Sequence, residues 1–240
     1  MMSKSPDGPT GEDVNPGRES ALHTYRGFVF DCDGVLLNSN PVKTRAFFEA
    51  ARPWGEAAAT TLVDYHTAHG GISRYQKFDY FFRHILGYEQ VPDQEMAKIL
   101  SRFAGAVRAG MASCEEAPGL RDFLSLLPQG CPRVVISGGD QEELRGIFKA
   151  RGLDVYFDAI LGSPVDKDTH LGNILTEGRI DLPAVFFGDA WYDFQVASRH
   201  GLDFIFLSGW SELDAWQSRF AGQPVQIYQD MAELRRALWP

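Results

Sequence analysis

Short apolar runs alternate with helix-length segments along most of this 240-residue chain. Uninterrupted apolar runs suit strands that are buried on both faces, as in parallel sheets covered by helices. The sequence therefore predicts an α/β fold built on a parallel sheet. The predicted strands are Gly27–Asp31, Arg133–Ser137, Ala159–Leu161, Ala184–Gly188 and Asp203–Leu207. Predicted helices of this part are Gln141–Arg151, Lys167–Thr176, Trp191–His200, Ser211–Phe220 and Met231–Leu238.

About a hundred residues between the first two strands break this alternation, because they contain helical patterns and no convincing strand. This interval predicts an all-helical insert over residues 38–116, within a sheet-containing core of residues 25–37 and 117–240. Gly/Pro-bearing joints near Asn38–Pro41 and Ala117–Gly119 are expected hinges. The insert helices are predicted at Thr44–Ala51, Ala57–His66, Ser73–Leu86 and Asp93–Val107.

The first 24 residues are expected to form a disordered tail, since they are rich in Pro, Gly, Ser and charge. They lack the apolar stretch of a signal peptide, and no run approaches the ~18 apolar residues of a membrane span. The net charge of −9 argues against nucleic acid or anionic membrane as a partner. The three cysteines show no paired spacing, which predicts a reducing, cytoplasmic location. The oligomeric state is left open.

Reactive residues follow four of the predicted strands, where open parallel sheets bind their ligands. The first strand ends in Asp31-Cys32-Asp33-Gly34, and the strand from Arg133 ends in Ser137-Gly138-Gly139. Lys167 follows the third strand, and Asp189 and Asp193 follow the fourth. Carboxylates that converge on one point repel one another unless a cation lies between them, which indicates Mg²⁺. A serine followed by two glycines, with a nearby lysine, suits a phosphate group. Together these residues predict phosphoryl transfer.

These four motifs, in this order, resemble those of the haloacid dehalogenase-like superfamily, whose Rossmann-like core carries a C1-type helical cap. The resemblance is to the phosphoglycolate phosphatase and β-phosphoglucomutase branch. It implies that Asp31 is the nucleophile, that Asp33 is the general acid and base, and that an aspartyl-phosphate forms. It also implies that Ser137, Gly138 and Lys167 bind the phosphoryl group. The implied metal ligands are Asp31, the backbone carbonyl of Asp33, Asp189 and Asp193.

The sequence departs from the family pattern at two points. Lys167 lacks the lysine-proline pair that many relatives carry, and Gly188 stands where some relatives have a second acid.

Within the insert, the segment from His69 to Lys77 resembles the substrate-binding turn of β-phosphoglucomutase-like caps. Ser73 and Arg74 are therefore expected to bind substrate, as is Lys43, which stands where the mutases have histidine. The expected reaction is Mg²⁺-dependent hydrolysis of a small phosphorylated metabolite, either a sugar phosphate or a phosphorylated acid. A phosphomutase and a catalytically silent binding protein are the alternatives.

Overall fold

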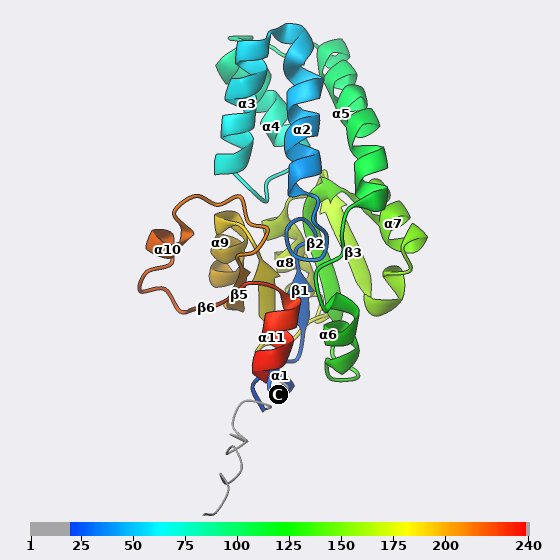
Figure 1. Cartoon of the computed structure of the whole chain (residues 1–240), viewed down its shortest axis with the longest axis vertical. Coiled ribbons are helices and arrows are strands. Elements are labelled where there is room, and N and C mark those ends of the chain that lie inside the picture. The colour runs from blue at the N-terminus through cyan, green and yellow to red at the C-terminus, as the bar shows by residue number, and fades with distance from the viewer. Residues whose placement is uncertain (1–19, 239–240) are drawn as a thin grey trace, which may run out of the picture.

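A computed structural model describes residues 20–238, and these form a single parallel sheet with helices on both faces and at one edge (Figure 1). The six strands lie in the order β3-β2-β1-β4-β5-β6, and every neighbouring pair is parallel. This arrangement confirms the predicted α/β class. The strands are β1 Phe28–Phe30, β2 Arg133–Asp140, β3 Ala159–Ser163, β4 Val185–Gly188, β5 Asp203–Leu207 and β6 Val225–Tyr228.

Alternate residues of each central strand enter different hydrophobic layers, because successive side chains of a strand point to opposite faces. On β1, Phe28 and Phe30 pack with helices α6, α7 and α11, whereas Val29 packs with α8 and α9. Both faces of the sheet are therefore buried, as the continuous apolar runs indicate. These helices are α6 Leu120–Leu126, α7 Gln141–Ala150, α8 Lys167–Thr176, α9 Trp191–Arg199 and α11 Met231–Leu238.

The long interval between β1 and β2 is helical, and Figure 1 shows its helices α2 to α5 gathered at one end of the molecule. Helices α2 and α5 pack along each other, and α2 also packs against α3. The last helix runs six residues beyond its predicted end at Val107, because Met111 continues its buried face. The helices are α2 Asn40–Ala51, α3 Glu56–Ala68, α4 Arg74–Tyr80, a π-helical turn Phe81–Ile85 and α5 Asp93–Ser113.

The two chain segments that join the helical insert to the sheet lie side by side. Leu37 forms an antiparallel bridge with Glu116, and the Asn38 amide donates to the Glu115 carbonyl at 2.9 Å. The Ala117 amide donates to the Leu36 carbonyl at 2.9 Å. The entrance and exit of the insert are thus held together by backbone hydrogen bonds.

The structure contains two elements that the sequence does not predict, and it shortens a predicted helix. Strand β6 was not predicted, because its residues are mostly half-buried or exposed rather than continuously apolar. Helix α6, Leu120–Leu126, was likewise not predicted. The predicted helix Ser211–Phe220 shrinks to α10, Trp216–Arg219, since its first residues form a loop that reaches the insert.

The end of the predicted tail also differs from the structure. Residues 20–23 form the short helix α1, whose Leu22 is buried against the core. Residues 1–19 of that predicted tail lie outside the described part of the chain. Within residues 20–238, none of the helices combines the length and apolar character that crossing a bilayer requires.

Candidate active site

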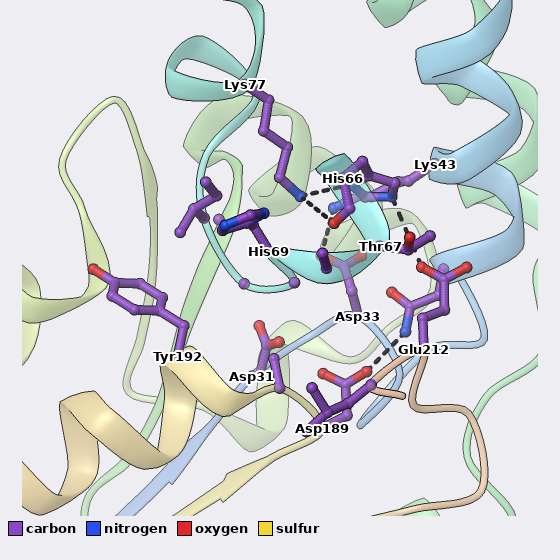
Figure 2. Close-up of a pocket in the computed structure, with 18 of the residues that line it drawn as sticks. Asp31, Asp33, Lys43, His66, Thr67, His69, Lys77, Asp189, Tyr192 and Glu212 are labelled. Atoms are coloured by element: carbon purple, nitrogen blue, oxygen red, sulfur yellow. Dashed lines mark hydrogen bonds and ion pairs between the residues drawn. The ribbon is translucent and has the colours of Figure 1, made fainter. Parts of the chain in front are cut away.

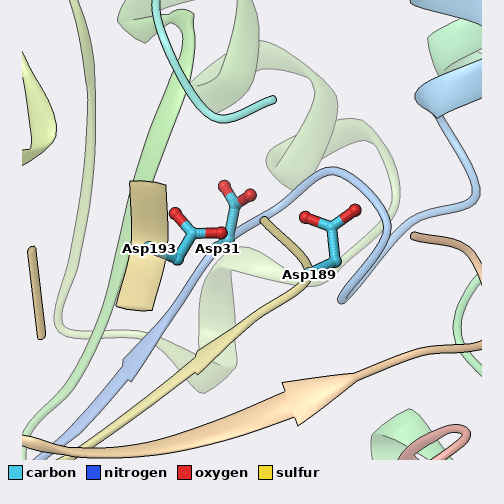
Figure 3. A group of neighbouring side chains, drawn as sticks. All are labelled: Asp31, Asp189 and Asp193. Carbon is cyan, nitrogen blue, oxygen red and sulfur yellow. The ribbon is translucent and has the colours of Figure 1, made fainter. Parts of the chain in front are cut away.

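Three buried carboxylates meet at the carboxyl ends of β1 and β4 (Figure 3). Asp31 directly follows β1, Asp189 directly follows β4, and Asp193 lies in the first turn of α9. One oxygen from each lies within 4.8 Å of the others. A side chain at Gly34 would place its Cβ 2.1 Å from an Asp189 oxygen, and one at Gly188 would lie 2.5 Å from the Asp193 Cβ. Glycine at these two positions therefore allows the carboxylates to converge.

Lys167 is the cation that contacts this cluster of three carboxylates. Its Nζ lies 2.9 Å from Asp31 Oδ1 and 2.6 Å from Asp193 Oδ1, and the lysine is buried. Burial alone would lower the pKa of Lys167, but Asp193 and Asp31 outweigh it and raise that pKa. The predicted Lys167 is thus in the site even without a neighbouring proline.

One ammonium does not balance three carboxylates. Burial, together with Asp193 and Asp33, raises the pKa of Asp31 to about 7 despite Lys167. Burial and the charges of Asp31 and Asp193 raise the pKa of Asp189 well above its ordinary value. When all three carboxylates are ionised, they exceed Lys167 by two negative charges, which fits a divalent, oxygen-preferring cation such as Mg²⁺.

Asp33 has a different environment although it lies only two residues from Asp31. Its carboxylate forms a close ion pair with Lys43 and accepts a hydrogen bond from the Ser39 hydroxyl. Burial alone would raise the pKa of Asp33, but Lys43 and Ser39 outweigh it and hold this pKa below its ordinary value. Two carboxyl groups of one motif therefore have pKa values displaced in opposite directions.

The serine–glycine motif lies beside Asp33. Ser137 is buried, with its Oγ 3.4 Å from Asp33 Oδ2 and accepting from the Gly139 amide at 3.1 Å. A Cβ at Gly138 would lie 2.6 Å from the carbonyl oxygen of Gly71. The glycine therefore lets a loop of the insert approach the sheet closely.

The insert residues predicted to bind substrate also lie near this end of the sheet. Ser73 caps α4 by accepting a hydrogen bond from the Gln76 amide. Arg74 donates to both oxygens of Glu143, at 3.1 and 2.6 Å, and its guanidinium lies over the ring of Phe103. The charge of Arg74 is thus paired with the core helix α7.

One cavity joins the two parts of the site, and Asp31, Asp33, Lys43, Asp189 and Arg74 all line it. Figure 2 shows Lys43, His66 and Lys77 of the insert on one side and Asp31 and Asp189 on the other. The polar lining residues that the sequence does not mark include Asn40, whose amide donates to Asp189 at 2.8 Å, and His66 and Glu212. These three belong to two helices and a loop that only the fold brings together. Lys77, which ends the segment that resembles a substrate-binding turn, also lines the cavity.

A family model for haloacid dehalogenase-like hydrolases matches residues 25–201. Solved structures share the fold across nearly their full length. A haloacid dehalogenase-like hydrolase from Bacteroides fragilis, itself called putative, is 17% identical, with a TM-score of 0.70 over 88% of this chain and 99% of that one. A putative phosphoglycolate phosphatase from Lactobacillus plantarum is also 17% identical, with a TM-score of 0.69 over 89% and 99%. A hydrolase from Pseudomonas syringae is 20% identical, with a TM-score of 0.70 over 88% and 96%. Among curated proteins, none matches this chain.

Proposed function

Because the chain belongs to the haloacid dehalogenase-like hydrolases, a family that includes phosphatases, we propose that it hydrolyses small phosphomonoesters with Mg²⁺ as cofactor. The observation that carries this proposal is the geometry of the site: the carboxylates of Asp31, Asp189 and Asp193 converge beside Lys167, and Asp31 and Asp33 line one cavity. Relatives of the same fold include putative phosphoglycolate phosphatases from Lactobacillus plantarum and Haemophilus somnus, which supports a phosphorylated metabolite as substrate.

In the proposed reaction, Asp31 attacks phosphorus and the bond to the leaving oxygen breaks, which forms an aspartyl-phosphate. Asp31, Asp189, Asp193 and the backbone carbonyl of Asp33 would hold Mg²⁺, and Asp193 would also orient Lys167 beside it. The cation supplies Lewis acidity and offsets the negative charge around phosphorus. Lys167, Ser137 and the amides near Gly138 bind the transferred group.

Protonated Asp33 gives its proton to the leaving oxygen. It then takes a proton from the water that attacks phosphorus, while the bond between the Asp31 oxygen and phosphorus breaks and phosphate leaves. The second role requires the ionised carboxylate, which the ion pair with Lys43 favours. Once Asp33 has given up its proton, a carboxylate held ionised by Lys43 promotes attack by water on the intermediate. This contact therefore supports a phosphatase over a phosphomutase, which must protect the intermediate from water.

We further propose that residues 38–116 act as a cap domain on the core formed by 25–37 and 117–240. The insert contributes Lys43, Arg74 and Lys77 to the cavity, so its position decides whether the site is enclosed. An enclosed site excludes water that would compete during the first step. The three free cysteines support a cytoplasmic location.

The test is phosphate release from p-nitrophenyl phosphate with and without MgCl₂. The wild type should be active only with the metal, and Asp31→Asn should lose at least 1,000-fold in kcat because amide nitrogen and oxygen are poor nucleophiles. Asp181→Asn, on a side chain 67% exposed, is the matched control and should keep full activity. An inactive wild type, or an active Asp31→Asn variant, would contradict the proposal. A substrate that is isomerised rather than hydrolysed would indicate the mutase.

A further inference from the structure

The insert places three cations in the cavity, and two of them are already neutralised. Lys43 forms an ion pair with Asp33, and Arg74 forms one with Glu143. Lys77 is 2% exposed and forms no ion pair with any residue in the range 20–238 that the structure describes. A buried ammonium without an acidic partner is unfavourable, so its place in a ligand cavity needs an explanation.

The contacts of Lys77 show that part of its hydrogen-bonding capacity is unused. Its Nζ lies 2.6 Å from His66 Nδ1 and 3.4 Å from the His66 carbonyl oxygen (Figure 2). An ammonium has three N–H donors. At least one donor therefore remains for a group in the cavity that Lys77 lines together with Asp31 and Asp33.

A hydrogen-bond chain fixes the direction in which Lys77 donates. Glu212 Oε1 accepts from the Thr44 hydroxyl at 2.8 Å, which uses the only proton of that hydroxyl. His66 Nε2, 3.1 Å from the same Thr44 oxygen, must then donate, so Nδ1 is the accepting nitrogen. Burial and the nearby lysines lower the pKa of His66 to about 2, which keeps its ring neutral and accepting.

We infer that Lys77 is a specificity-determining residue whose ammonium binds a carboxylate on the leaving group of the substrate. This inference rests on the proposed phosphatase function and narrows it to phosphate esters of small hydroxy acids. A singly charged carboxylate matches the single unpaired ammonium, whereas a second phosphate would bring about two negative charges. Arg74, the residue that the sequence favoured for this role, instead joins α4 to α7.

The charge on Lys77 links this recognition to pH. Burial, followed by the charge of Lys43, lowers the pKa of Lys77 to about 7. The carboxylate needs the protonated amine, so KM for an acidic substrate should rise as pH increases above 7. The charged and titratable groups around Lys77 are His66, Lys43, Asp33, Glu212 and Lys167.

The test compares esters that differ only in a carboxylate. 3-Phosphoglycerate is paired with glycerol 1-phosphate, and 2-phosphoglycolate with 2-hydroxyethyl phosphate, since a hydroxymethyl group replaces the carboxylate in each pair. We expect the wild type to favour the acidic ester of at least one pair at least tenfold in kcat/KM. Lys77→Met should reduce that preference at least tenfold, mainly through KM. Lys77→Arg should retain part of the preference for the acidic ester. In this variant the preference should no longer fall between pH 7 and pH 9.

Lys98→Met is the matched control, because this lysine lies on the outer surface of α5 with 58% of its side chain exposed. It should leave the preference unchanged.

A second readout is calorimetric binding of D-glycerate to the wild type at pH 7.5 in two buffers of different ionisation enthalpy. Carboxylate binding should take up protons, and Lys77→Met should abolish that uptake.

Three results would overturn the inference. One is equal use of both esters in each pair by the wild type, and another is a preference that survives in a folded Lys77→Met variant. The third is stronger use of bisphosphates than of phosphorylated acids. In each of these cases phosphate is still released, so the phosphatase proposal stands. If no ester is hydrolysed, that proposal fails, and glycerate binding with proton uptake still tests Lys77.

Discussion

At the scale of single residues, the site depends on where side chains are absent as much as on where they are present. Gly34 has φ +75° and faces an Asp189 oxygen, so it meets two constraints at once. Left-handed backbone strains any residue with a Cβ. The close carboxylate adds a steric constraint that concerns function directly, because Asp189 belongs to the proposed metal site.

Gly34→Ala should therefore lower stability and also weaken Mg²⁺ binding at least tenfold. The matched control is Gly222→Ala, which has φ +76° but no atom within 4 Å of the added Cβ. Backbone strain alone should reduce the unfolding free energy by about 1 kcal/mol in the control. Urea unfolding measures the stability change, and calorimetric titration measures the metal affinity. If both variants keep the wild-type affinity, the close approach to Asp189 has no part in metal binding.

At the scale of elements, the insert is joined to the core by polar contacts between α4 and α7. Arg74 binds Glu143 through two hydrogen bonds, and the Tyr75 hydroxyl donates to Asp140 at 3.0 Å. Arg74 is 6% exposed at its side chain, so this pair is shielded from solvent on one side. Two-point contacts of arginine with a carboxylate are strong and geometrically selective.

A double-mutant cycle of Arg74→Gln and Glu143→Gln should give a coupling energy of about 1–2 kcal/mol in urea unfolding. The comparison pair is Arg83 and Asp79, which are both about half exposed on one helix face. That exposed pair should give only about 0.3–0.5 kcal/mol. Equal coupling in the two cycles would mean that the Arg74 contact does not hold the insert on the core.

The sequence predicts an element well when that element is extensively buried. Strand β5 and helices α8 and α11 have the predicted bounds, because their apolar residues are continuous or fall on one helix face. Strand β6, at the edge of the sheet, is partly exposed and has no such pattern. The residues before α10 look helical in sequence, yet Ser211 and Glu212 bond to Asp189 and Thr44 instead. Tertiary contacts there override local propensity.

The candidate site likewise contains residues that the sequence predicts and residues that it does not. Its core residues were predictable because each follows a strand, and parallel strands bring their carboxyl ends to one edge. The cluster of Thr44, His66 and Lys77 comes from three helices of the insert. Their meeting depends on helix packing angles, which no local pattern encodes. The sequence therefore predicts the chemistry better than the recognition of the leaving group.

At the scale of the whole molecule, the buried carboxylates couple metal binding to stability. The pKa of Asp189 is raised on folding, so the metal-free protein loses stability as pH rises above the unfolded pKa, because the unfolded state ionises more readily than the folded state. At a hundred times the dissociation constant, Mg²⁺ should add about 2.7 kcal/mol to the unfolding free energy. For a chain of this length, that is a rise in Tm of roughly 5–10 °C.

Asp189→Asn should separate the two effects. The variant should be more stable than the wild type without metal, because it lacks the carboxyl group whose ionisation burial disfavours, and its Tm should no longer respond to Mg²⁺. Asp181→Asn, on an exposed side chain, should behave as the wild type does. Thermal unfolding at pH 7.5 with EDTA or with MgCl₂ gives both quantities. A metal response that persists in Asp189→Asn would remove this residue from the proposed ligands.

The hydrogen-bonded segments at Leu36–Asn38 and Glu115–Ala117 have a consequence for how such chains diversify. The polypeptide leaves the sheet and returns to it at neighbouring points, so the distance that the intervening segment must span hardly depends on its length or sequence. The loop-closure penalty for a longer or shorter insertion therefore changes little. Evolution, or a protein engineer, can exchange the helices that recognise the leaving group as one cassette, while Asp31 and its neighbours keep their positions.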